Sequence, residues 1–335
     1  MIDRALEHIA EALLAGNAQF LFGAGMSRAS GLPTGNELAL ALLEEFFARP
    51  RREGTITDER LQQLAQEFPL EVIASAFERS SSHGRSSLTA VLAGLLANPD
   101  TEPNDGHHAF SALLGAPPRV TSIFTTNYDI LLEKELGPEL AVAITERNAE
   151  KLASVRRSSQ IPILYLRGKL DEDNYVISER EVLSPKYRLL VEEFRSALHL
   201  AGAFVFVGFS LTDPDFRTWY QAFQEQLEIR EANGKKTYFV MPAQDEFSYA
   251  LGDKIWQQRN AVWIPLTAEA FFVQLKIVAQ GRTLYNIRRE VRSDYGVNDA
   301  QLEELIQQTS EAWRMSADEA LIFLYEARTR IGVST

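Results

Sequence analysis

The stretch FLFGAGMSRASGLPTGNEL, residues 20–38, joins a short apolar run to the beginning of an amphipathic segment. An apolar run of this length is typical of a buried strand in a parallel sheet. Gly23, Ala24 and Gly25 follow the run at once. Residues this small allow a tight turn and let a bulky anion, such as a dinucleotide pyrophosphate, approach the main chain. A plain turn, in which the glycines serve backbone geometry alone, explains the same residues equally well.

Five further short apolar runs follow along the chain, at residues 120–125, 161–166, 203–208, 237–241 and 261–265. Each is separated from the next by a segment with helical character, for example DILLEKEL after the first of them. Strands that alternate with helices are typical of a parallel sheet with helices on both faces. The pattern predicts an α/β fold with a doubly wound, parallel, Rossmann-like sheet.

The domain organisation is predicted from the place where this alternation is interrupted. Residues 36–115 read as one helix after another, which is too much for a single crossover, so we expect a helical insertion lobe beside the sheet. The predicted domains are residues 1–270, with the sheet and its lobe, and residues 271–335, a C-terminal helical module. In that module Leu321, Leu324 and Tyr325 share a helical face, which indicates either an assembly surface or packing against the parent domain.

The composition excludes several classes of protein. The chain has 335 residues, a formal net charge of −12, five histidines and no cysteine. The acidic balance argues against a protein that grips nucleic acid through a broad basic surface. Without cysteine there is no disulfide, no cysteine nucleophile and no thiolate-bound metal, and the histidines have no recognisable metal spacing. The N-terminus lacks a secretion-signal pattern and no apolar run reaches membrane-spanning length, so we expect a cytoplasmic protein without a metal.

Four segments carry a family resemblance, and they occur in the family's order. The glycine-rich stretch GAGMSRASGLP, residues 23–33, resembles the NAD-binding loop of the sirtuin family. PNDGH at residues 103–107, TTNYD at residues 125–129 and VGFSLTDPDF at residues 207–216 are similar to further motifs of that family. The resemblance covers residues 15–270. Tyr128 in TTNYD and the segment SLTDPD resemble the zinc-free bacterial branch of the type found in anti-phage defence systems. The absence of cysteine supports this independently, because deacetylating sirtuins share a four-cysteine zinc module.

The resemblance implies an activity, a ligand and partners. It implies that the chain cleaves NAD to nicotinamide and ADP-ribose, as an effector of anti-phage defence. The implied partners are NAD and either further copies of the chain, a second protein subunit that senses the trigger, or both. We expect no direct nucleic-acid contact, no membrane and no zinc. The residues that the resemblance places at NAD are Gly23, Ala24, Gly25, Ser27, Ser30, Pro33, Thr125, Thr126, Asn127, Asp129, Gly208, Phe209, Ser210 and Asp213.

Asn127 and Asp129 are the candidate catalytic residues in TTNYD. Breaking the nicotinamide–ribose bond requires a held dinucleotide, a dry pocket and a polar group that directs water. The Asn127 amide both donates and accepts, which suits it to orient a water molecule or the ribose hydroxyls. The resemblance places Asp129 where it fixes the loop or the nicotinamide side. Both residues also suit a cap of the helix that is expected next.

Arg167, the third candidate catalytic residue, departs from the family pattern. ILYLRGKLD, residues 163–171, aligns with the family's Leu-His-Gly segment and puts Arg167 at the position of the catalytic histidine. A guanidinium stays protonated and cannot accept a proton, although it can bind a phosphate or carboxylate in a bidentate way. Two hypotheses therefore stay open. The chain is a slow NAD hydrolase, or it is a module that binds NAD or ADP-ribose as a regulatory ligand.

Four other residues are candidates to replace the missing base. His107 and His108 are two of them, although a histidine at a helix start is more often a capping or packing residue. Asp213 and Asp215 also fit as caps of the helix expected after them. A serine hydrolase is disfavoured because no serine has histidine and carboxylate partners at a recognisable spacing. An NAD-dependent oxidoreductase is disfavoured because no ribose-binding acidic residue follows a second short strand.

Overall fold

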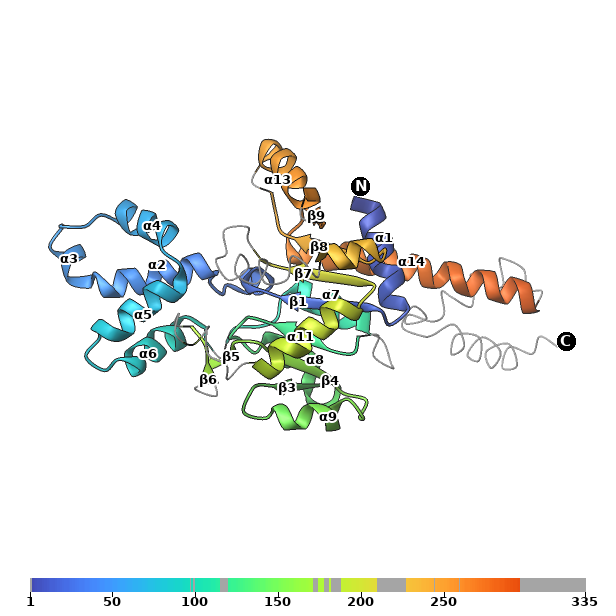
Figure 1. Cartoon of the computed structure of the whole chain (residues 1–335), viewed down its shortest axis with the longest axis horizontal. Helices are drawn as coiled ribbons and strands as arrows, with labels where there is room; N and C mark the ends of the chain where they lie inside the picture. Colours follow the sequence, from blue (N-terminus) through green and yellow to red (C-terminus); the bar gives the residue numbers. More distant parts are fainter. Residues whose placement is uncertain are drawn as a thin grey trace.

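A central sheet of seven parallel strands runs through the molecule (Figure 1). The structure, a computed structural model, describes residues 2–96, 98, 100–114, 120–170, 174–177, 181, 188–209, 227–243, 245–258 and 260–295. The strands of the sheet are β1 (Ala18–Phe22), β2 (Ile123–Thr125), β3 (Ala141–Ile144), β4 (Ile161–Tyr165), β7 (Ala203–Val207), β8 (Lys236–Val240) and β9 (Val262–Ile264). They lie in the order β3-β4-β2-β1-β7-β8-β9, and every neighbouring pair is parallel.

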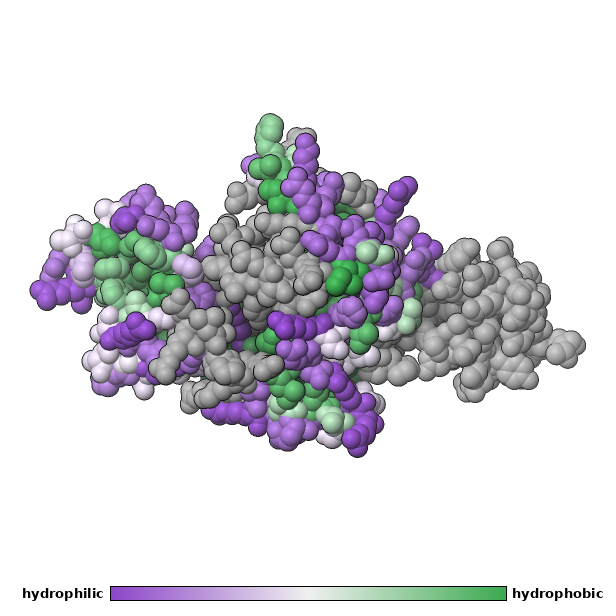
Figure 2. Space-filling model, viewed as in Figure 1, coloured by the Kyte–Doolittle hydropathy of each residue, from purple (hydrophilic) through white to green (hydrophobic). Residues whose placement is uncertain are grey.

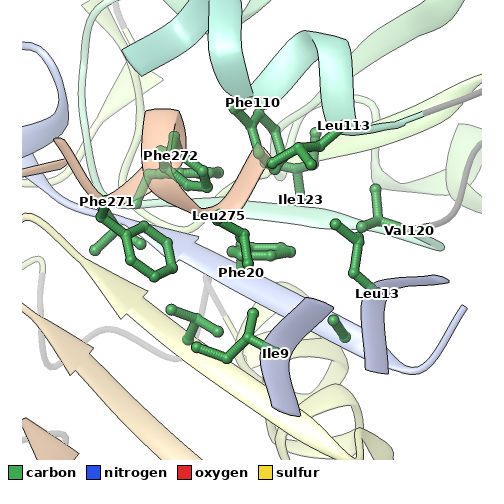
Figure 3. Close-up of a cluster of buried hydrophobic side chains, with 14 of the residues drawn as sticks. Ile9, Leu13, Phe20, Phe110, Leu113, Val120, Ile123, Phe271, Phe272 and Leu275 are labelled. Atoms are coloured by element: carbon green, nitrogen blue, oxygen red, sulfur yellow. The ribbon is translucent and has the colours of Figure 1, made fainter. Parts of the chain in front are cut away.

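Helices cover both faces of the sheet, which confirms the prediction of a doubly wound α/β fold. One face carries α1 (Ile2–Leu14), α7 (Asp105–Leu114), α8 (Leu131–Leu140) and α14 (Ala268–Tyr295). The other carries α9 (Leu152–Val155), α11 (Arg188–Leu200) and α13 (Glu246–Gln258). Successive residues of β1 point to opposite faces, so Phe20 packs into the first core and Leu21 into the second. Figure 3 shows Phe20 among Ile9 of α1, Phe110 of α7 and Leu275 of α14.

All six strands that the sequence predicts are present, and the sheet has one strand more. The additional strand, β3, has only four residues, and two of them are incompletely buried at the edge of the sheet. The patterns also do not predict a small hairpin, formed by β5 (Gly168–Lys169) and β6 (Asn174–Tyr175). Elements this short give no usable periodicity, because two to four residues do not complete a pattern.

A helical lobe stands beside the sheet and has a hydrophobic core of its own (Figure 1). Its helices are α2 (Gly35–Phe46), α3 (Ala48–Arg52), α4 (Asp58–Glu67), α5 (Leu70–Ser80) and α6 (Arg85–Leu96). Tyr128, after β2, and Tyr175, in β6, complete the core of the lobe. The lobe is therefore attached where β2 and β4 end. α7 falls within the predicted insertion range but packs on the sheet through Phe110, so the helices of the lobe end with α6.

The predicted domain boundary at residue 270 falls inside α14, which begins at Ala268. The first turns of α14 are part of the sheet's core, because Phe271, Phe272 and Leu275 are fully buried. Residues 296–335, which hold the face predicted for the C-terminal module, lie outside the described residues. Figure 2 shows apolar residues on α13, where Phe247 is 86% exposed. None of the helices that the structure describes combines the length and the apolar character needed to cross a membrane.

Candidate functional site

The candidate site lies at the topological switch point of the sheet. On one side of β1 the chain adds β2, β4 and β3, and on the other side it adds β7, β8 and β9. β1 has β2 on one side and β7 on the other, and the three strands are parallel. The loops after these strands therefore leave the same edge of the sheet. They carry the motifs at residues 23–33 and 125–129 and the beginning of the motif at residue 207. Such a switch point is the usual place for a ligand in an open α/β sheet.

The glycines allow the loops after β1 and β7 to touch each other. A Cβ on Gly25 would lie 2.7 Å from Gly208 Cα, and a Cβ on Gly23 would lie 3.0 Å from the Gly208 oxygen. Gly208 itself has a φ of 79°, in the left-handed region that favours glycine. The N–H groups of Gly23 and Gly25 donate to the main-chain oxygens of Val207 and Gly208, at 2.8 and 2.9 Å. Close packing of two main chains thus accounts for both glycines.

The rest of the glycine-rich loop folds into two short 3₁₀ turns, Ala24–Met26 and Arg28–Ser30, before α2 begins at Gly35. The glycines therefore do not lie at the N-terminus of an α-helix. The N–H groups of Met26 and Ser27 bond back to Gly23 and Ala24. Among residues 23–27, only the main-chain N–H of Ala24 has no acceptor in the part of the chain that the structure describes. The loop thus offers an anion one free N–H here, rather than the row of N–H groups that a helix start presents.

Asn127, Ser27 and Asp129 form one hydrogen-bonded chain between the loops after β1 and β2. The Ser27 hydroxyl donates to Asp129 Oδ2 at 2.8 Å, and Asn127 Nδ2 donates to Ser27 Oγ at 3.2 Å. Because the hydroxyl has a single proton, donation to Asp129 makes Ser27 the acceptor toward Asn127. This leaves Asn127 Oδ1 buried, with no hydrogen-bond partner among the described residues. A buried acceptor without a partner costs about 1–3 kcal/mol, so a ligand or water donor would stabilise this atom.

Asp129 also bonds the start of the next helix, one residue before the N-cap position, Ile130. Its Oδ1 accepts a hydrogen bond from the Leu131 N–H at 3.0 Å, at the start of α8. Burial raises the pKa of Asp129, and the hydrogen bonds from the Leu131 N–H and the Ser27 hydroxyl act in the opposite direction. The carboxyl is therefore held between a helix start and the hydroxyl that orients Asn127.

Thr125 and Thr126 hold the end of β2 against β1. The Thr125 hydroxyl donates to the Phe22 oxygen at 3.3 Å and accepts from the Asn127 N–H at 3.0 Å. The Thr126 N–H donates to the same Phe22 oxygen at 3.0 Å. These bonds fix the main chain of Asn127 at the end of the strand, so its side chain has a defined position in the loop.

Arg167 is buried and paired with an acidic residue of the lobe. Its Nη2 lies 3.2 Å from Glu71 Oε1, and the two side chains are only 6% and 8% exposed. Glu71 lies on the buried face of α5. Burial raises the pKa of Tyr128 to about 12, and the neighbouring Arg167 guanidinium acts in the opposite direction. The charge of Arg167 is thus engaged in fastening the lobe to the segment that follows β4.

The two neighbouring histidines have different surroundings. His107 is buried, and its Nδ1 accepts from the Asn104 N–H at 3.3 Å. Burial and the nearby His108 lower the pKa of His107 to about 4, so its imidazole is neutral at neutral pH. His108 is exposed, and its Nδ1 lies 2.6 Å from Glu135 Oε2 on α8. The packing role that the sequence suggested for a histidine at this helix start matches His107.

Some of the remaining predicted residues lie in the loops at the switch point, and the others lie outside the described residues. Ser30 and Pro33 belong to the loop after β1, and Gly208 and Phe209 follow β7. The Phe209 ring packs in the core of the second face. The predicted residues Ser210, Asp213 and Asp215 lie outside the described residues. In the described part of the chain, no group of three or more histidine and acidic residues is arranged to hold a metal ion.

Sequence reasoning did not single out two residues that contact the candidate site residues or their loop. Glu71 pairs with Arg167, and the signal for it is an acidic residue on a helical face otherwise occupied by Ile73 and Phe77. Asn104 bonds the glycine-rich loop through Met26, and the signal for it is an asparagine directly before the helix start in PNDGH.

Comparison with known proteins finds a domain family and several proteins that are similar to this chain. The SIR2-like domain family matches residues 121–264. The NAD(+) hydrolase ThsA of Enterococcus faecium is 24% identical over 214 residues, which are 63% of this chain and 40% of that protein. The NAD(+) hydrolase ThsA of Acinetobacter baumannii (strain 532279) is 28% identical over 219 residues, which are 64% of this chain and 40% of that protein. The chain thus spans about two fifths of the length of these relatives.

A solved structure described as "Structural Basis for the Mechanism and Regulation of Sir2 Enzymes" is also similar. It is 15% identical, with a TM-score of 0.45 over 82% of this chain and 97% of that chain.

Proposed function

We propose that this chain, which matches the SIR2-like domain family at residues 121–264, hydrolyses NAD to nicotinamide and ADP-ribose. The observation that carries the proposal is the buried Asn127 Oδ1, which lacks a partner in the described part of the chain and lies at the switch point of the sheet. An acceptor in this position fits a ribose hydroxyl or a water molecule. The name NAD(+) hydrolase of the two relatives supports the same substrate.

In the proposed reaction, the bond between the nicotinamide nitrogen and the ribose C1′ breaks, and its electron pair stays on nicotinamide. The oxygen of a water molecule bonds to C1′, and the proton that this water loses goes to solvent as the positive charge of the nicotinamide ring disappears. Asn127 Oδ1 orients the water or the ribose, while Ser27 and Asp129 hold the amide in one orientation. The leaving group needs no acid, because it departs as a neutral molecule.

Arg167 is not a proton acceptor in this proposal. A guanidinium stays protonated, and this one is paired with Glu71 at 3.2 Å. General-base catalysis contributes about 10²–10⁴-fold to a rate, so we expect hydrolysis to be slow. The same pairing favours a second candidate function, in which the chain binds NAD or ADP-ribose as a regulatory ligand and does not turn it over.

Nicotinamide release from NAD by the purified full-length chain tests the proposal. We expect turnover in the wild-type chain and a loss of at least about 100-fold in Asn127→Ala. Asn233→Ala is the matched control, because Asn233 is exposed and its side chain bonds locally, to the Ile229 oxygen. No turnover in any assembly state would refute hydrolysis. Retention of NAD in a calorimeter without turnover would select the regulatory binding module.

The proposal includes a setting for the activity. We propose a role in anti-phage defence, in which the chain acts with further copies of itself or with a second subunit that senses the trigger. The resemblance of the motifs at residues 23–33 and 125–129 to the bacterial sirtuin-like branch supports this setting. Size-exclusion chromatography with light scattering, on the chain alone and after purification with its cellular partners, tests the assembly.

A further inference from the structure

The side chain of Asn104 bonds both the glycine-rich loop and the start of α7. Its Oδ1 accepts from the N–H groups of Gly106 and His107, at 2.9 and 3.3 Å, which caps the helix. Its Nδ2 donates to the Met26 oxygen at 2.9 Å and to Ser30 Oγ at 3.0 Å. The two ends of one amide thus do two separable things, because the oxygen caps α7 and the nitrogen holds the loop.

The other residues of PNDGH keep Asn104 in place. The Asn104 N–H donates to His107 Nδ1 at 3.3 Å, which fixes the main chain of Asn104. A Cβ on Gly106 would lie 3.0 Å from Asn104 Oδ1 and 3.0 Å from Glu269 Cα on α14, so glycine is needed for this approach. The Asn104 amide is therefore supported by its own helix start and by α14 behind it.

The loop that Asn104 holds is the one that orients the candidate reactive amide. Met26, whose oxygen Asn104 binds, is the residue directly before Ser27, and Ser27 connects Asn127 to Asp129. On its other side the loop is held by the contact of Gly25 with Gly208. Residues 25–30 are therefore fixed from two directions, and the Asn104 Nδ2 supplies the side-chain bonds on the α7 side.

We propose that Asn104 is a positioning residue that fixes the glycine-rich loop so that Ser27 presents Asn127 to the dinucleotide. This inference rests on the proposed function for its ligand, but its structural half, the holding of the loop, does not depend on NAD. Asn104 touches the loop and not the reacting atoms, so its loss acts on NAD affinity through the conformation of residues 25–30.

Two substitutions separate the holding of the loop from the capping of the helix. Asn104→Asp keeps the shape of the side chain and the oxygen that caps α7. It replaces the Nδ2 donor by a second carboxylate oxygen, which cannot donate to the Met26 oxygen. Asn104→Ser also keeps a capping oxygen, but its side chain is too short to reach the loop. Asn104→Ala loses both roles. Thr57→Ala is the matched control for the loss of a cap alone, because Thr57 caps α4 in the lobe by accepting from the Arg60 N–H.

Hydrogen exchange of the loop amides is the first measurement, made on the full chain without ligand. The N–H groups of Met26, Ser27, Ser30 and Gly31 are bonded within the loop, so their exchange reports its opening. We expect about tenfold faster exchange in Asn104→Asp and Asn104→Ser, which corresponds to the loss of roughly one net hydrogen bond. Because Asn104→Asp and Asn104→Ser keep a capping oxygen, we expect their melting temperatures to equal or exceed that of Thr57→Ala. We expect Asn104→Ala, which loses both roles, to melt at a lower temperature than these two variants. Unchanged exchange in both variants would overturn the proposal and leave Asn104 as a helix cap.

Calorimetric titration with NAD is the second measurement. We expect about tenfold weaker binding in Asn104→Asp and Asn104→Ser and unchanged binding in Thr57→Ala. If exchange is faster but NAD binds as tightly as in the wild-type chain, Asn104 does not position the site, and the inference fails. If the wild-type chain itself does not retain NAD, the proposed function fails, and the exchange experiment still decides whether Asn104 holds the loop.

Discussion

Replacing Arg167 by the histidine that the family pattern contains should destabilise the protein before it changes any chemistry. Glu71 would keep its buried carboxylate and lose the guanidinium that now lies 3.2 Å away. At an effective dielectric constant of about 20, two charges at that distance attract by ~5 kcal/mol. In the intact pair this attraction offsets the desolvation of both groups, whereas removal of one partner leaves the other charge uncompensated. We therefore expect Arg167→His to lower the free energy of unfolding by about 3–5 kcal/mol.

Two further variants isolate the cause of that loss. Glu71→Gln combined with Arg167→His removes the uncompensated carboxylate, so we expect the double variant to lose only about 1–2 kcal/mol. Arg49→His is the matched control in the same lobe. Arg49 also pairs with an acid, Glu53 at 2.7 Å, but the two side chains are 83% and 51% exposed. An exposed pair of this kind contributes little, so we expect a change within about 0.5 kcal/mol.

Equilibrium unfolding in urea, followed by tryptophan fluorescence, measures all three variants against the wild-type chain. Trp256 and Trp263 are buried in the core of the second sheet face, so their emission reports loss of that packing. The slopes of the transitions must agree for the free energies to be compared. The reasoning is refuted if Arg167→His costs no more than Arg49→His, or if the double variant is no more stable than the single one. A search for activity gained with histidine at position 167 should accordingly use the double variant.

Three further predictions concern the loops at the switch point. Gly25→Ala should lower the free energy of unfolding in urea by about 1–3 kcal/mol, because the new Cβ would lie 2.7 Å from Gly208 Cα; a neutral effect would contradict the close packing. Ser27→Ala should reduce nicotinamide release by about tenfold or more while the chain stays folded, since Asn127 loses the partner that orients it; full activity would show that the orientation is set elsewhere. Asp129 has a pKa raised by burial, so its carboxyl contributes stability that is present below the unfolded pKa and is lost as pH rises through the folded pKa. As the pH rises from acid to neutral, the free energy of unfolding of Asp129→Asn in urea should therefore increase relative to that of the wild-type chain. A decrease in this difference with rising pH would exclude a raised pKa.

The sheet was predictable because its strands are buried on both sides and read as continuous apolar runs. AFVFV at Ala203–Val207 is an example, since all five of its residues are buried. β3 escaped prediction because the edge of the sheet leaves half of its residues incompletely buried, which removes the signal. The helices of the lobe were predictable from periodicity, but their boundary with α7 was not. α7 has the same amphipathic character as its neighbours, and only its packing in the core of the sheet, as of Phe110 against Phe22, assigns it to the sheet.

The local part of the candidate site was predictable, and the long-range part was not. TTNYD at the end of a strand places Asn127 and Asp129 two residues apart in one loop, and a motif shows that directly. The partner of Arg167 lies 96 residues earlier in the chain, on a helix of the lobe. No periodicity indicates which face of α5 meets which strand end, because that depends on how the whole lobe packs. The same holds for Asn104, which reaches Met26 across 78 residues.

The glycines at residues 23 and 25 are therefore explained in part by something other than the pyrophosphate contact that their motif suggests. Its N–H groups at Gly23 and Gly25 are occupied, and its missing side chains make room for Gly208 rather than for a row of phosphate contacts. Under the proposed function, that close contact serves the dinucleotide indirectly. It brings the loop after β1 down onto the switch point, where Ser27 reaches the Asn127 amide and leaves its oxygen without a partner in the described part of the chain. Small residues in this motif thus act through the position they give to Ser27, so a bulkier side chain at Gly25 should affect dinucleotide binding even if the phosphates never touch that residue.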